Sequence, residues 1–325
     1  MMLDNNWYGH RYILANYCNE KDRLAYASIQ HGWSAYYNYG YLGFNEDGTF
    51  GSNKLLSFPY LVWSEEIKNN CKNKGLKNVH SIGAPFIYLC ELLKTEKYIN
   101  IKQNSKGIIF FPSHNTKIFK DVKINHDKII EEIEKTSEGP YTICIYDSDL
   151  GDPSIEIYKK KNWNIVSCGP RDDNFMLFKQ YIEITKHEKV ISTEICTPIF
   201  YAMYLKKKTK VLEESRGEIV FDRLDDRLRE NEMAYDTKWI NNSYKIYRKN
   251  LLTKSPSLFD DFLSAEEGFK LAKIELGFNS LRKPNELKYL LGWSNFLKKT
   301  LSIFISQYFS VKYGKEIRTG KKELV

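Results

Sequence analysis

The chain has 325 residues and a formal net charge of +8, with 42% hydrophobic and 28% charged residues. This length predicts two domains, or one domain with an appendage, and the composition excludes disordered, collagen-like and coiled-coil chains. The charge suits an anionic partner, either a phosphorylated substrate, a membrane surface or nucleic acid, but does not select among them.

Membrane-spanning, secreted and zinc-binding proteins are disfavoured. No apolar run reaches the 18 residues that a spanning helix needs, and the first residues lack the basic stretch and apolar core of a secretory signal. The six cysteines stand singly, without a C-x-x-C pair. This spacing predicts reduced thiols in a cytoplasmic protein and no metal site.

Residues 1–100 predict a small α/β domain, the acceptor side of the site proposed below. Its sheet is expected to be short, because only brief apolar runs separate the helical patterns. The expected strands are 24–32, 58–64 and 79–83, and the expected helices are 64–75 and 85–94. Residues 96–107 form the best candidate for an interdomain linker.

Residues 101–220 predict a second α/β domain with a parallel sheet. Strands separated by about 20–35 residues, with helical patterns between them, indicate repeated βαβ units. The expected strands are 107–111, 141–146, 162–169, 188–193 and 209–214, and the expected helices are 127–135, 153–160, 173–185 and 196–206.

Residues 221–325 predict a helical extension. Ser264 and Glu267 have the spacing of a capping box for a helix ending at Gly277, and Pro284 opens another helix. From Trp293 to Phe309 the apolar residues share one helical face, beside a segment of net charge +6. This face either packs on the two domains or attaches the protein to the inner membrane surface through residues 293–325.

Polar residues follow several of the expected strands. Ligands bind beyond the carboxyl ends of parallel strands, so these residues are candidates for one site in a cleft between the two domains. In the first domain they are His31, Gly32, Trp33 and Gly83; in the second they are Ser113, His114, Gly169, Arg171, Ser192, Thr193 and Glu194.

Each candidate has a plain structural alternative. Ser192 and Thr193 precede a helix, where hydroxyls and free N–H groups bind phosphate but also serve as ordinary caps. His31 at a strand end suits a general base, or a histidine bonded within the structure. His114 suits a nucleotide contact or a loop histidine, and Arg171 suits a diphosphate or an ion pair with a neighbouring aspartate.

The order of these motifs resembles the GT-B glycosyltransferases of bacterial surface-polysaccharide biosynthesis, including capsule and lipopolysaccharide enzymes, and the related CDP-glycerol glycerophosphotransferases. The resemblance covers roughly residues 25–215. The four matching segments are IQHGWS (29–34), SIGAPF (81–86), FFPSHN (110–115) and ISTEICTPIFYAMYLKKKTKVL (191–212). The sequence departs from these families at Ser192-Thr193-Glu194 and at Trp33, and it contains no His-Pro dipeptide.

The resemblance implies a GT-B-like α/β fold and metal-independent transfer of a sugar from a nucleotide-activated donor to a glycan or lipid-linked acceptor. It implies His31 as the catalytic base and Ser192, Thr193 and Arg171 as the donor-phosphate site. Ser113, His114, Gly169 and Glu194 would contact the donor nucleotide or sugar. Gly32, Trp33 and Gly83 would lie on the acceptor side, and no further cofactor is expected.

Three alternatives remain open at this point. A polyol-phosphate transferase would use the same motifs with a different donor. A nucleic-acid-binding protein is compatible with the charge and the 23 tyrosines, but no helix-turn-helix, KH, RNP or zinc motif supports it. An inactive scaffold with the same fold is the third reading, and only a transfer assay separates it from an enzyme.

Overall fold

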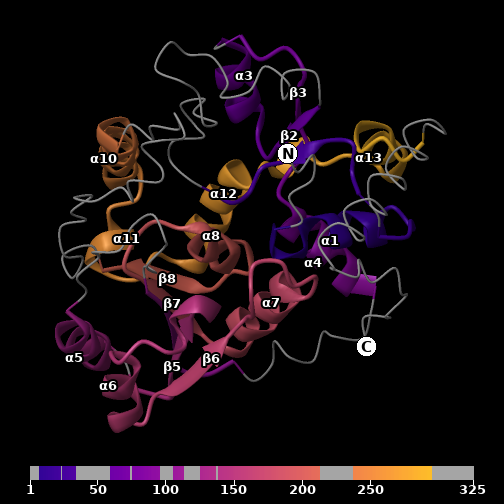
Figure 1. Cartoon of the computed structure of the whole chain (residues 1–325). Helices are drawn as coiled ribbons and strands as arrows, with labels where there is room; N and C mark the ends of the chain where they lie inside the picture. The colour runs from indigo at the N-terminus through magenta and orange to yellow at the C-terminus, as the bar shows by residue number, and fades with distance from the viewer. Residues whose placement is uncertain are drawn as a thin grey trace, which may run out of the picture.

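The computed structural model describes residues 7–22, 24–33, 59–73, 75–95, 105–112, 125–136, 138–212 and 237–294. Two parallel sheets and a set of C-terminal helices form the architecture (Figure 1). The α/β class expected from the sequence is confirmed. The expected domain limits near residues 100 and 220 fall at or beside segments outside the described residues and stay predictions.

The larger sheet has the strand order β6-β5-β4-β7-β8, with every neighbouring pair parallel. Its chain order is that of a Rossmann-type sheet, in which the first strand lies at the centre and the order reverses beside it. The strands are β4 (Ile108–Phe111), β5 (Tyr141–Ile145), β6 (Asn164–Ser167), β7 (Lys189–Ser192) and β8 (Lys208–Val211).

Helices cover both faces of this sheet. Alternate residues of β4 divide between two cores: Ile108 and Phe110 pack with α5 and α6, whereas Ile109 packs with α7 and α8. Burial of successive side chains on opposite faces explains why the strands are almost continuously apolar. The helices are α5 (His126–Thr136), α6 (Ile155–Lys160), α7 (Met176–Lys186) and α8 (Thr197–Tyr204).

The smaller sheet has three parallel strands in the order β1-β2-β3. Helix α3 covers one face, where Ile67 and Cys71 meet Val62 and Val79. The strands are β1 (Ser28–Ile29), β2 (Tyr60–Val62) and β3 (Val79–Ser81), and the helices are α1 (His10–Tyr17), α3 (Glu65–Asn73) and α4 (Pro85–Thr95). The short sheet is as expected, but the strand predicted over 24–32 is only two residues long and helix α1 was not predicted.

The C-terminal helices contact both sheets, first β8 and α8 of the larger sheet over residues 257–275 and then the first sheet over residues 276–293. They are α10 (Thr237–Lys254), α11 (Ser257–Asp260), α12 (Ala265–Glu275) and α13 (Pro284–Leu290). The predicted N-cap is present, since Ser264 Oγ accepts the Glu267 N–H at 3.3 Å; the hydroxyl also donates to the Glu267 carboxylate at 2.6 Å, in place of the main-chain bond that would complete a capping box. Trp293 is buried and donates from Nε1 to the Leu24 carbonyl at 3.2 Å.

This part of the extension therefore packs on the body. The remaining residues of the predicted amphipathic face, including Phe304, Ile305 and Phe309, lie outside the described part of the chain. Within the described ranges, no helix is both long and apolar enough to cross a membrane.

Candidate functional site

The order of the larger sheet reverses between β4 and β7. The helix that follows β4 in the chain, α5, lies on one face, and the helix that follows β7, α8, lies on the other (Figure 1). The two connections therefore diverge at the carboxyl ends of these strands, and such a point is where parallel sheets bind nucleotides. Ser192 is the last residue of β7 and lies at this point, and Thr193 and Glu194 follow it directly.

The turn from β7 into α8 is tightly ordered. Ser192 and Thr193 are fully buried, and Ser192 Oγ donates to the Glu194 carbonyl at 2.5 Å. Helix α8 begins after Cys196 with Pro198 in its first turn. In this geometry the Ser192 hydroxyl shapes the turn, so a bound phosphate would meet main-chain N–H groups at the helix start before it met that hydroxyl.

The start of α8 carries no thiolate that would compete with an anion. Burial raises the pKa of the Cys196 thiol to about 12, with the Glu194 carboxylate adding to the rise. The thiol is therefore neutral near pH 7. The partial positive charge of the helix start is left to a bound anionic group.

The loop after β1 docks on the start of α8. The Trp33 N–H donates to Thr197 Oγ1 at 2.9 Å, and a Cβ on Gly32 would lie 3.0 Å from the same oxygen. The Trp33 indole is buried, with Nε1 donating to Glu275 at 2.7 Å and the ring 4.6 Å from that of Phe200. Gly32 therefore permits the close approach of this loop to the start of α8. The Trp33 ring is buried against Phe200 and bonded to Glu275, so it is not a surface on which an acceptor could stack.

His31 lies in the same loop and is half-buried. Its Nε2 is 3.1 Å from the Tyr8 hydroxyl. Tyr8 has a left-handed backbone (φ 60°), and its N–H donates to the Arg171 carbonyl at 2.5 Å. A Cβ on the next residue, Gly9, would lie 2.1 Å from the Asn174 carbonyl oxygen. The segment around Tyr8 thus bridges His31 and the loop that follows β6.

Arg171 is exposed in that loop. Burial raises the pKa of the Tyr146 hydroxyl, and the Arg171 charge opposes the rise, so Arg171 lies near Tyr146, the residue that follows β5. Gly169 has a left-handed backbone (φ 89°), and its N–H donates to Ser167 Oγ at 3.1 Å. A Cβ on Gly169 would lie 3.0 Å from Asp173, which pairs with Lys179 at 2.6 Å. Gly169 sets the path of this loop.

Gly83 does not join this group. A Cβ there would lie 2.7 Å from the Leu281 side chain and 3.1 Å from the Gly277 carbonyl, and the adjacent Ala84 N–H donates to the Leu276 carbonyl at 2.8 Å. The C-terminal chain thus covers the end of β3, and packing accounts for this glycine. Ser113 and His114 lie outside the described residues.

Two residues of the junction were missed from the sequence. Tyr8 touches His31 and the Arg171 loop, and Thr197 receives the loop after β1. The Tyr8-Gly9 pair indicates at most a tight turn, and Thr197 before a proline resembles any helix start. Neither pattern states which distant loop the residue meets.

The arrangement combines three elements useful for group transfer. A helix start and the exposed Arg171 can stabilise a negative leaving group. The His31 imidazole can accept a proton. The described contacts bring the loops that carry these groups together at one junction between the two sheets.

Comparison with known proteins does not assign this chain to a family. No family model and no curated protein matches it. Among solved structures, a UDP-GlcNAc 2-epimerase from Neisseria meningitidis bound to UDP-GlcNAc aligns over 77% of this chain, with 16% identity and a TM-score of 0.33. The chain spans 61% of that protein. S. aureus MnaA, solved with UDP, aligns over 88% of this chain and 79% of its own, with 13% identity and a TM-score of 0.42.

Proposed function

We propose that this protein is a glycosyltransferase that uses a nucleotide-activated sugar and a glycan or lipid-linked acceptor. One observation carries the proposal: the loop holding His31 is bonded to the start of α8 at the point where the larger sheet reverses its order. This contact supports the proposal, because the loop that carries the candidate base docks on the candidate phosphate site, at the position where parallel sheets bind nucleotides.

The proposed reaction is a single displacement. An acceptor hydroxyl oxygen attacks the anomeric carbon, the bond from that carbon to the donor phosphate breaks, and His31 takes the hydroxyl proton. The departing phosphate retains the bonding electron pair, and its charge is stabilised by the N–H groups at the start of α8 and by Arg171. Metal is not needed for charge balance, because these groups supply the positive potential.

The hydrogen bond between Tyr8 and His31 bears on the proton transfer. Nε2 lies 3.1 Å from the Tyr8 hydroxyl, and which of the two donates determines which ring nitrogen carries the hydrogen. The bond would fix both the tautomer and the orientation of the ring.

Donor binding is tested by thermal shift with UDP, GDP, CDP, CMP, ADP and dTDP. We expect the nucleotides of one nucleobase to raise the melting temperature selectively, because a ligand that binds only the folded state stabilises it. Arg171→Gln should weaken binding of that nucleotide about tenfold, the cost of one charge-assisted hydrogen bond. Lys159→Gln removes an equal charge from the exposed side of α6 and should change nothing. Stabilisation by none of the six, or equal loss in both variants, contradicts the donor site.

The role of His31 is tested with the nucleotide sugar that this panel selects. His31→Ala should lower kcat by about 10²–10⁴-fold and leave nucleotide affinity unchanged. Tyr8→Phe should retain the ring packing against His31 while altering the pH profile of kcat. Turnover of His31→Ala at the native rate would show that the histidine is structural.

A further inference from the structure

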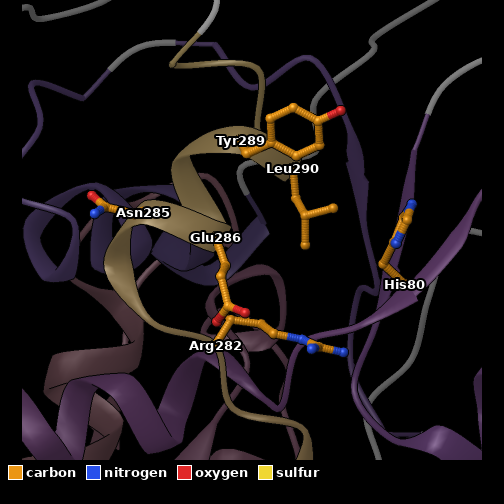
Figure 2. Close-up of a pocket in the computed structure, with 6 residues that line it drawn as sticks. All are labelled: His80, Arg282, Asn285, Glu286, Tyr289 and Leu290. Carbon is orange, nitrogen blue, oxygen red and sulfur yellow. The ribbon is translucent and has the colours of Figure 1, made fainter.

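A pocket of about 460 Å³ lies between helix α13 and strand β3, where no expected site residue falls (Figure 2). In Figure 1, α13 stands beside the small sheet, on the side away from the five-stranded sheet and the junction at α8. Its lining residues are His80, Arg282, Asn285, Glu286, Tyr289 and Leu290.

Arg282 is held firmly at the base of this pocket. Its Nε donates to the Ser81 carbonyl at 2.9 Å, its Nη2 lies 3.4 Å from Ser81 Oγ, and its main-chain N–H donates to the Tyr88 hydroxyl at 2.8 Å. Figure 2 shows the guanidinium extending toward the strand that carries His80. Among the described residues, no hydrogen bond uses Nη1, so this nitrogen is a positioned donor for a ligand oxygen.

His80 supplies the complementary group on the opposite wall. Its Nε2 donates to Asn78 Oδ1 at 2.9 Å, which leaves the lone pair on Nδ1. Burial, aided by the Lys68 and Arg282 charges, lowers the pKa of this imidazole, so it is neutral at pH 7. Nδ1 is thus an acceptor for a ligand hydroxyl.

An aromatic surface completes the pocket. Tyr289 is 73% exposed, the largest exposure among the large hydrophobic side chains of the described residues, and Leu290 lies beside it (Figure 2). Glu286, whose Oε2 accepts the Lys283 N–H at 2.9 Å, lies next to Arg282. An exposed ring with donors and acceptors around it matches a ligand that has an apolar face and a hydroxylated rim.

We propose that this pocket binds one neutral saccharide unit of a glycan. A pyranose presents C–H groups on one face, which would stack on Tyr289, and hydroxyls that would reach Arg282 and His80. A phosphate fits less well, because the Glu65 carboxylate lies 3.8 Å from Nη2 of Arg282 and the Glu286 carboxylate also lines the pocket. Use of the pocket to hold an acceptor glycan rests on the proposed glycosyl transfer, whereas saccharide binding does not.

The test uses methyl glycosides of glucose, galactose, rhamnose, N-acetylglucosamine and N-acetylgalactosamine, with inorganic phosphate as the anionic probe. Saturation-transfer NMR and titration calorimetry on the full chain should detect at least one glycoside. Tyr289→Ala should weaken it at least tenfold and Tyr289→Trp should retain it. Ile274→Ala, an exposed apolar residue on α12, is the matched control and should bind normally.

Binding of no glycoside, binding of phosphate alone, or equal binding by Tyr289→Ala overturns the proposal. The nucleotide panel separates this result from the proposed transfer, since Tyr289→Ala should keep native nucleotide affinity. Glycoside binding without any nucleotide binding would retain the pocket and reject the transferase.

Discussion

The two sheets reach stability in different ways. The five-stranded sheet is covered on both faces by the helices that alternate with its strands, and its α5–α6 face forms a separate core. The C-terminal chain only adds to its β8 edge, where Leu263 exchanges two hydrogen bonds with Thr209. The three-stranded sheet has strands of two or three residues, and several main-chain hydrogen bonds beside these strands are made with the C-terminal chain. So small a sheet buries too little surface to persist alone. The first sheet is therefore completed by residues that follow it by about 200 positions.

This dependence is visible in the contacts that the C-terminal chain makes. The Tyr26 N–H donates to the Leu291 carbonyl at 2.8 Å, just before β1. A Cβ on Gly277 would lie 1.8 Å from the Trp63 carbonyl oxygen, just after β2. Arg282 donates to Ser81 at the end of β3. The C-terminal chain thus contacts β1 near its amino end, and β2 and β3 at or near their carboxyl ends.

The largest expected effect comes from Trp293→Ala. The side chain is 2% exposed, and its loss should lower the free energy of unfolding by about 3–5 kcal/mol. Hydrogen exchange should accelerate mainly in β1–β3, because Trp293 bonds the Leu24 carbonyl in the segment that leads into β1. Trp163→Ala, a buried tryptophan under the larger sheet, is the control and should act mainly on β5 and β6. Equal acceleration in both sheets for either variant would contradict the division.

A smaller loss is expected from Gly277→Ala. The residue has φ 69°, and a Cβ would strike the Trp63 carbonyl, so the chain must shift away from the end of β2. We expect destabilisation of at least about 2 kcal/mol in urea unfolding. Gly151→Ala serves as control, since a Cβ there meets nothing within 4 Å and should be tolerated. Equal stability of the two variants would mean that the C-terminal chain docks more loosely than its contacts indicate.

The smallest expected effect is the loss of folding stability at acidic pH. Burial, with help from His31, lowers the pKa of His10 to about 3, well below its usual 6.5. Between these values the unfolded chain binds one more proton than the folded chain, so stability falls as pH drops below 6.5, by up to about 1.4 kcal/mol per pH unit.

His10→Leu should remove this part of the slope, measured as the difference in unfolding free energy from native protein between pH 7 and pH 5. His187, buried under the larger sheet, also has a lowered pKa, and His187→Leu gives the comparison for that sheet. An unchanged slope in His10→Leu would show that His10 finds solvent or a partner in the folded state.

Much of the larger unit was predictable from local pattern. Apolar runs such as GIIFF predicted each of its strands within two or three residues, because strands buried on both faces must be continuously apolar. The Ser264–Glu267 cap and the Pro284 start of α13 were also found, since capping depends on neighbouring residues alone. Helix α1 was missed because its first turn has no side-chain cap to mark its start.

The candidate site was only partly accessible in this way. The sequence by itself identified loops at strand ends, among them His31 and the turn at Ser192, because βαβ order determines which residues follow each strand. Tertiary structure alone decided that the Ser192 hydroxyl turns inward, that Tyr8 bonds His31, and that the C-terminal chain covers Gly83. The bond to His31 and the covering of Gly83 depend on contacts between residues 23 and about 200 positions apart, which leave no local periodicity or spacing to read. The sequence thus determined which loops are candidates for binding, and packing decided which of their side chains are held within the structure.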